Sequence, residues 1–284
     1  MPAAASATRL PDLARLIKLG ARPAKSPPHR GRDALDNAAL MPSATNGPAS
    51  ASAIAFAHEV ARLWERELAD DFLGFYLIGS LAHGGFNERY SDIDVLLTAA
   101  KPLGPQVRDN VAQQATALSL ALAGKLSLHW TVENFSAGRF LPLDRLDYLD
   151  HAVMLLERRR VEPLRPSRAE VRAYLAGAPF ENWTQQVAHF SALETLTRGD
   201  HKRYLRAILY PARFVYSWET GAMASNDEAV LFLRRRADNL DFDLIARALE
   251  CRNRGADPSP LFPERDKLPG LLDACRRLVA ASGG

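Results

Sequence analysis

The sequence predicts a small α/β (α+β) domain with a mixed sheet, followed by an all-helical C-terminal domain. In the first part of the chain, a segment with helical spacing of apolar residues alternates with short apolar runs that end at turn residues. In the C-terminal half, apolar residues recur at helical spacing. The chain has 284 residues, of which 47% are hydrophobic, so it can bury a core in one large or two small domains.

The first domain is predicted over residues 53–142. It begins with an amphipathic helix, because apolar residues from Ile54 to Leu68 recur close to every 3.6 positions. The run "FLGFYLIGS" predicts a buried strand at about 73–78, since it is short, apolar and aromatic and ends at a glycine. Three further elements complete the order: a strand in "SDIDVLLTA", a helix in "PQVRDNVAQQATALSLALAG" closed by Gly124, and a strand in "KLSLHWTVENF".

Residues 143–284 are predicted as the helical C-terminal domain. Ser167 and Glu170 form a capping box that starts a helix, and Gly177 is a plausible stop. The longest apolar stripe, in "HKRYLRAILYPARFVYSWETG", is interpreted as core.

The first 52 residues are predicted to form a disordered tail. They are rich in Ala, Pro, Ser and Arg and poor in aromatic residues, so they cannot bury enough apolar surface to offset the entropy of ordering. A transit peptide, or translation starting at Met41, are the alternatives.

Composition excludes several classes of function. No apolar run approaches the roughly 20 residues that span a bilayer, so no membrane role is expected. The net charge of +3 is modest, and no nucleic acid partner is predicted. Cys251 and Cys275 lie far apart without metal-site spacing, which is typical of reduced thiols in a cytoplasmic protein.

The stretch "LIGSLAHGGFNERYSDIDVLL" carries the strongest chemical signal. Residues two apart in a strand share a face, so Asp92 and Asp94 point to the same side. Two neighbouring carboxylates repel each other unless a cation neutralises them, and hard oxygen ligands with room for phosphates favour Mg²⁺. Gly79 lets a phosphate approach the backbone closely, and Ser80 offers a hydroxyl and an N–H group. An anion cradle facing a metal pair indicates phosphoryl or nucleotidyl transfer.

These residues resemble the nucleotidyltransferase superfamily related to polymerase beta, whose signature is Gly-Ser followed by Asp-x-Asp. More specifically, the chain resembles the aminoglycoside adenylyltransferases that modify streptomycin and spectinomycin, which add a helical C-terminal domain. "YLDHAVMLLERRRVEPLRP" looks like the linking helix of that family and the turn after it. "ARFVYSWETGAMASNDEAVLFLRR" looks like its C-terminal segment. The resemblance covers roughly residues 53–255.

The resemblance implies a set of roles for the matching residues. Ser80 and Ser91 would contact the triphosphate of ATP, Asp92 and Asp94 would hold Mg²⁺, and Arg213 would reach the phosphates. A hydroxyl of the antibiotic would attack the α-phosphorus, and pyrophosphate would leave.

The sequence departs from the family at the general base. The family's glutamate of the third strand falls on Ser127 or His129, and His129 is favoured because "HWTV" then overlays the family's Glu-x-Thr-x run. A histidine can accept a proton near neutral pH, so activity could survive the change. The alternative is that His129 is a hydrogen-bonded spacer. Glu133 is the carboxylate on the same face, but it lies beyond the expected place, and the lysine expected after Thr-Gly is Ala222.

The function predicted from the sequence is an enzyme that transfers AMP from MgATP to a hydroxyl of a small cationic acceptor such as an aminoglycoside. Trp183, Glu181 and Asp200 lie where such enzymes line an acceptor pocket. The alternatives are a nucleotide-binding module that has lost catalysis, an antitoxin-like interaction protein, or an enzyme that modifies a protein hydroxyl.

Overall fold

The computed structural model describes residues 47–235 and 240–281. The predicted tail at 1–52 therefore lies outside the described residues, except for its last few positions. Those positions are helical: helix α1 spans Pro48–Leu68, begins with a proline in its first turn, and starts before the predicted Ala53. The described residues belong to one compact unit of the chain.

The sheet has five strands in the order β4-β3-β2-β1-β5. Strands β2 and β3 pair in parallel, and the other pairs are antiparallel, so the sheet is mixed as predicted. The elements from β1 to β5 are β1 (Phe72–Leu77), α2 (Gly79–Ala82), β2 (Ile93–Ala99), α3 (Pro105–Leu118), α4 (Leu120–Ala123), β3 (Leu126–Val132), β4 (Gly138–Arg139), α5 (Pro142–His151) and β5 (Val153–Glu157). A 3₁₀ turn, η2 (Ala69–Asp71), joins α1 to β1.

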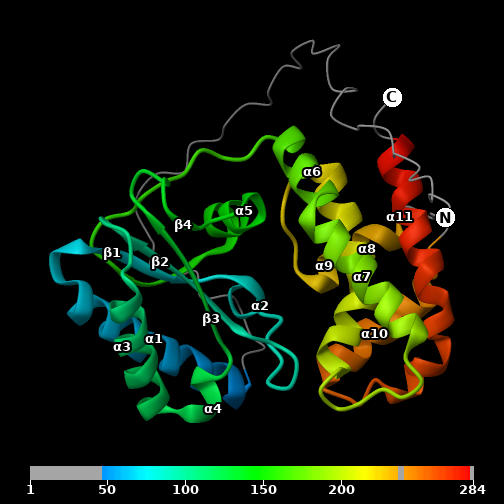
Figure 1. Cartoon of the computed structure of the whole chain (residues 1–284), viewed down its shortest axis with the longest axis horizontal. Helices are drawn as coiled ribbons and strands as arrows, with labels where there is room; N and C mark the ends of the chain where they lie inside the picture. The colour runs from blue at the N-terminus through cyan, green and yellow to red at the C-terminus, as the bar shows by residue number, and fades with distance from the viewer. Residues whose placement is uncertain (1–46, 236–239, 282–284) are drawn as a thin grey trace, which may run out of the picture. The chain divides into compact units, whose positions relative to one another are not determined.

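The two faces of the sheet are covered by different helices (Figure 1). Phe75 and Leu77 of β1 face a core that they share with α1 and α3. Tyr76 and Leu96 point to the opposite face, where they pack with Tyr148 of α5. Because side chains alternate along a strand, Asp94 of β2 belongs to the face of Leu96. The pleat thus directs the carboxylate toward α5.

The segment that resembled a linking helix is divided between two elements. Helix α5 ends at His151, and the residues after it form β5, whose Val153 pairs with Leu77 of β1. The resemblance to a linking helix and a turn left this strand out: Met154 and Leu156 complete the edge of the sheet by pairing with β1. The start of the region 143–284 therefore contributes a strand to the sheet.

The described elements after β5 are all helices. They are α6 (Arg168–Ala176), α7 (Ala178–Ala192), α8 (His201–Thr220), α9 (Asn226–Arg234), α10 (Phe242–Arg254), the 3₁₀ segment η3 (Ser259–Lys267) and α11 (Leu268–Ala281). Helix α8 lies at the centre of their core, with Tyr204, Ile208 and Phe214 fully buried. It passes through Pro211 without ending, and Gly221, with φ of 70°, closes it in the left-handed conformation.

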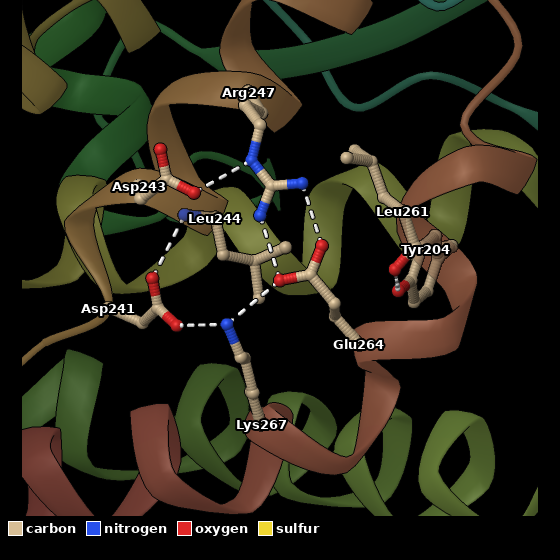
Figure 2. A network of polar contacts seen from close by, with 8 residues as sticks. All are labelled: Tyr204, Asp241, Asp243, Leu244, Arg247, Leu261, Glu264 and Lys267. Carbon is tan, nitrogen blue, oxygen red and sulfur yellow. Dashed lines mark hydrogen bonds and ion pairs between the residues drawn. The ribbon is translucent and has the colours of Figure 1, made fainter.

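A polar network fixes the start of α10 to η3, as Figure 2 shows. Arg247 donates two hydrogen bonds to Glu264, at 2.7 and 2.8 Å, and Lys267 bridges Glu264 to Asp241, the residue that caps α10. The bonds from Arg247 and then Lys267 lower the pKa of Glu264 to about 2. The network therefore stays ionised in mild acid. It positions α10, which supplies Arg252 to the site described next.

Candidate active site

The seven residues that the sequence predicts to hold ATP and Mg²⁺ or to act as the base all line one cavity of about 500 Å³. Its walls come from the sheet and its loops on one side and from helices of the C-terminal half on the other. The seven are Gly79, Ser80, Ser91, Asp92, Asp94, His129 and Arg213.

The turn after β1 brings the backbone against a carboxylate. Gly79 has φ of 64°, and a Cβ atom built on it would lie 2.6 Å from Oδ2 of Asp94. Ile78 donates its N–H group to the backbone oxygen of Asp94 at 3.0 Å. Only a glycine has both the backbone freedom and the missing side chain that this approach requires. Gly79 therefore lets Asp94 lie directly beside Ser80.

The two aspartates at the start of β2 differ in their surroundings. Burial raises the pKa of Asp94; nearby His129 lowers it and the charge of Asp92 raises it again, with a net shift upward. Asp92 faces cations of α8: Nζ of Lys202 lies 2.5 Å from its Oδ1, and Nη2 of Arg206 lies 3.8 Å from its Oδ2. Within the part of the chain that the structure describes, Asp94 thus has no cation at ion-pair distance, whereas Asp92 already pairs with one.

This donor set fits Mg²⁺. Asp92 and Asp94 lie two residues apart and offer two carboxylates to the cavity. Burial disfavours the ionised form of Asp94 unless a cation is near. The contact with Lys202 shows that the position next to Asp92 accommodates a cation. No cluster of three or more His, Cys, Asp or Glu side chains forms a metal site by itself within residues 47–235 and 240–281. Mg²⁺ commonly uses one or two carboxylates together with substrate phosphates. Asp92 and Asp94 would hold it here, with phosphate oxygens of a substrate as further ligands.

The register of β3 bears on the choice between Ser127 and His129. In the parallel pairing, Ser127 lies opposite Asp94, and His129 lies opposite Leu96, one step further along the same face. His129 is 6% exposed, and its Nδ1 lies 3.3 Å from Oδ2 of Asp144 without forming a hydrogen bond. Both residues line the cavity, and of the two side chains the imidazole of His129 is the kind that serves as a general base in enzymes.

Glu133 is not available as the base. It follows β3, forms a bidentate ion pair with Arg159 and does not line the cavity. The hydrogen bond from Arg159 lowers the pKa of Glu133.

Arg213 of α8 and Arg252 of α10 line the cavity in addition to Arg206. The Arg213 side chain is accessible to solvent within the cavity, yet protein surrounds it on several sides and lowers its pKa, with Asp147 acting in the opposite direction. Arg252 of α10 donates to the Ser91 hydroxyl at 3.0 Å and to the Gly85 backbone oxygen at 3.1 Å. Ser91 therefore connects the loop before β2 to α10. Nothing in the sequence distinguished Arg252 from the other arginines near it.

Comparison with solved structures decides the fold. A crystal structure of spectinomycin adenyltransferase AAD(9) from Enterococcus faecialis, with ATP and spectinomycin, is similar to this chain with a TM-score of 0.56 and 13% sequence identity. The match covers 79% of this chain and 98% of that chain. This chain has a nucleotidyltransferase-like fold.

Two other similarities are weaker. Structures of a toxin-antitoxin with AMP-PNP and of the toxin-antitoxin MntA-HpeT mutant match with TM-scores of 0.26 and 0.24, over 46% and 44% of this chain, at 17% and 15% identity. These scores are too low to support any argument. No family model matches the chain, and neither does any curated protein.

In this nucleotidyltransferase-like fold, α5 supplies a site residue that sequence analysis missed. Asp147 is 4% exposed, accepts the Gly79 N–H group at 2.6 Å and lies 2.6 Å from Nε2 of His83. Burial raises the pKa of the Asp147 carboxyl, but the hydrogen bond and charge of His83 and the Gly79 N–H group outweigh burial and lower it overall. Asp147 thus fixes the Gly79–Ser80 turn. The available signal was an acidic residue between apolar Leu146 and Tyr148.

Replacing Asp147 by asparagine is expected to lower the free energy of unfolding by about 3 kcal/mol, because a buried charge interaction with two partners is broken. Asp150→Asn on the same helix is the matched control, since Asp150 is exposed and paired with Arg165 at the surface. Asp150→Asn should lower the free energy of unfolding by less than about 1 kcal/mol. Urea unfolding of both variants measures the difference, and equal costs would contradict the role given to Asp147.

The residues expected to line an acceptor pocket do not line the cavity. Trp183 is 1% exposed and donates its indole N–H group to the Ala207 backbone oxygen at 2.9 Å, so it is a core residue. Glu181 is exposed, and Asp200 accepts a hydrogen bond from Thr197.

Among the described residues, none of the helices has the length and apolar character that a membrane crossing requires.

Proposed function

We propose that this protein transfers AMP from MgATP to a hydroxyl group of a small molecule and releases pyrophosphate. One observation carries the proposal. Asp92 and Asp94 share a cavity wall with the Gly79–Ser80 turn, and Arg213 lines the same cavity from α8. A cation site beside a phosphate-binding turn, with an arginine within the same space, is suited to holding a triphosphate during an in-line displacement. The nucleotidyltransferase-like fold agrees with this chemistry.

In the proposed reaction, the acceptor oxygen forms a bond to the α-phosphorus, and the bond from that phosphorus to the β-phosphate oxygen breaks. Ser80 and Arg213 bind and orient the phosphates, and the hydroxyl proton passes to His129. Mg²⁺ bound by Asp92 and Asp94 would neutralise charge that develops on the phosphate oxygens. His129 is suited to its role because it is buried in the cavity wall near Asp94.

An aminoglycoside is the first acceptor to test. The adenyltransferase with the similar fold was solved with ATP and spectinomycin. Asp144, which lines the cavity next to His129, offers a carboxylate to a cationic acceptor. A cytoplasmic location is proposed with this function, because both cysteines of the sequence, Cys251 and Cys275, are free thiols.

Pyrophosphate release tests the proposal. The purified protein is incubated with MgATP and each member of a panel of aminoglycosides and other hydroxylated small molecules, beside an Asp92→Ala variant. Release that depends on one acceptor and on Asp92 is the expected result. Binding of MgATP without release would instead favour a nucleotide-binding module that has lost catalysis, which the replacement of the glutamate on β3 also favours.

A further inference from the structure

Two cations at the start of α8 meet the proposed metal ligands. Lys202 and Arg206 are four residues apart, so they lie on the same face of the helix. Both line the cavity, and both approach Asp92, at 2.5 and 3.8 Å. Neither side chain is buried: Lys202 is 33% exposed and Arg206 is 61% exposed. They are therefore able to change partners when a ligand enters.

The charges of the cavity indicate what those partners are. Mg²⁺ would cancel the two carboxylates of β2, which leaves the roughly four negative charges of the triphosphate to be balanced by protein cations. The cations of α8 and α10 that line the cavity, within the described residues, are Lys202, Arg206, Arg213 and Arg252. Arg139 of β4 lines the cavity as well, so the two at the start of α8 supply two of the five Lys and Arg charges found there among the described residues.

The position of Lys202 beside Asp92 also favours contact with the nucleotide phosphates. A metal held by Asp92 would also bind phosphate oxygens of the nucleotide, so the carboxylate and those oxygens would lie close together. A cation that already touches Asp92 is therefore within reach of phosphate oxygens on the same metal. Lys202 is placed to change partners from the carboxylate to a phosphate without leaving the cavity.

We infer that Lys202 and Arg206 bind the nucleotide phosphates, and that Lys202 forms an ion pair with Asp92 when no metal is bound. This assignment rests on the proposed function, because it needs a nucleotide triphosphate in the cavity. It makes two opposite predictions for one variant. Without nucleotide, Lys202 competes with the metal for Asp92, whereas with nucleotide it contributes to binding.

The test uses Lys202→Met, which keeps an unbranched side chain of similar length and removes the charge. Mn²⁺ binding without nucleotide, followed by electron paramagnetic resonance, is expected to tighten about threefold, because an exposed ion pair no longer competes. MgATP binding, followed by calorimetry, is expected to weaken about tenfold, because a charge-assisted hydrogen bond is lost. Arg206→Gln should change both quantities in the same directions.

Arg203→Met is the matched control. Arg203 is the next residue of α8, is exposed, stacks on the ring of Phe190 and does not line the cavity. It should leave both affinities unchanged. If Lys202→Met weakens both affinities, or leaves MgATP binding unchanged, the assignment is overturned while the proposed function stands. If the unmutated protein binds no MgATP, the proposed function and the assignment fail together.

Discussion

Replacing Asp94 by asparagine is expected to abolish AMP transfer and to stabilise the metal-free protein. Transfer should fall by roughly a thousandfold or more, because a metal site contributes several kcal/mol to such a reaction. Stability should rise because burial, together with Asp92, holds the pKa of Asp94 above its ordinary value, so the ionised form is strained in the folded chain. Asparagine keeps the shape and removes the charge.

The sign of the pH dependence follows from that shift. A carboxyl group whose pKa is raised by folding binds its proton more tightly in the folded chain than in the unfolded chain. Its contribution to stability is therefore fully present below the unfolded pKa of about 3.8 and is lost as the pH rises through the higher folded pKa. The advantage of Asp94→Asn over the unmutated protein should be absent in acid and present at neutral pH.

Thermal unfolding of the Asp94→Asn variant and the unmutated protein, with a chelator present and at acid and neutral pH, tests this prediction. At neutral pH the midpoint of Asp94→Asn should be higher by about 2 °C. Asp70→Asn is the control, because Asp70 is exposed in the 3₁₀ turn before β1. An Asp94→Asn protein that keeps its transfer rate would contradict the metal assignment, and one that melts lower at neutral pH would contradict the electrostatic account.

Replacing Gly79 by alanine is expected to destabilise the protein by about 1–3 kcal/mol and to weaken metal binding. Two physical causes act together. Alanine disfavours the left-handed backbone, since φ is 64°, and its Cβ atom would lie 2.6 Å from Oδ2 and 3.1 Å from Cβ of Asp94. Asp94 has to move away, which displaces the carboxylate that the metal needs.

Gly84→Ala separates these two causes. Gly84 follows in the same loop with φ of 74°, but no atom lies within 4 Å of the position its Cβ would take. Both variants should lose stability through backbone strain, whereas only Gly79→Ala should also lose affinity for Mn²⁺. Unfolding in urea and Mn²⁺ titration of the two variants give the comparison. Equal Mn²⁺ affinities in the two variants would show that the approach of Gly79 to Asp94 does not shape the metal site.

Local pattern was enough to predict the centre of the sheet. The buried run at 73–78 predicted β1 to within a residue, and "KLSLHWTVENF" contains β3, which ends three residues before that run does, because burial on one or both faces leaves a direct mark on the sequence. The helix predicted up to Gly124 is divided instead at Ser119, whose side chain caps the short helix α4. Strand β5 was missed, because its partner β1 lies far away along the chain.

The residues of the candidate site also differ in how far local sequence could predict them. Gly79, Ser80, Asp92 and Asp94 lie within one short stretch, so their spacing alone indicated a phosphate and metal site. Asp147, Lys202 and Arg252 enter the site from distant helices, and their sequence neighbours give no sign of it. Trp183 was misinterpreted as an acceptor contact because a large aromatic residue has the same sequence signal in a core as in a pocket.

Tracing the α-phosphorus of ATP tests the central claim most directly. The protein is incubated with Mg²⁺, ATP labelled at the α-phosphorus and the acceptor panel, and the products are separated and identified by mass spectrometry. We expect the label on an acceptor that has gained an AMP group, with unlabelled pyrophosphate in equal amount, and neither product with Asp94→Asn. Label that stays in ATP across the panel, or that appears in ADP, would contradict nucleotidyl transfer by this site.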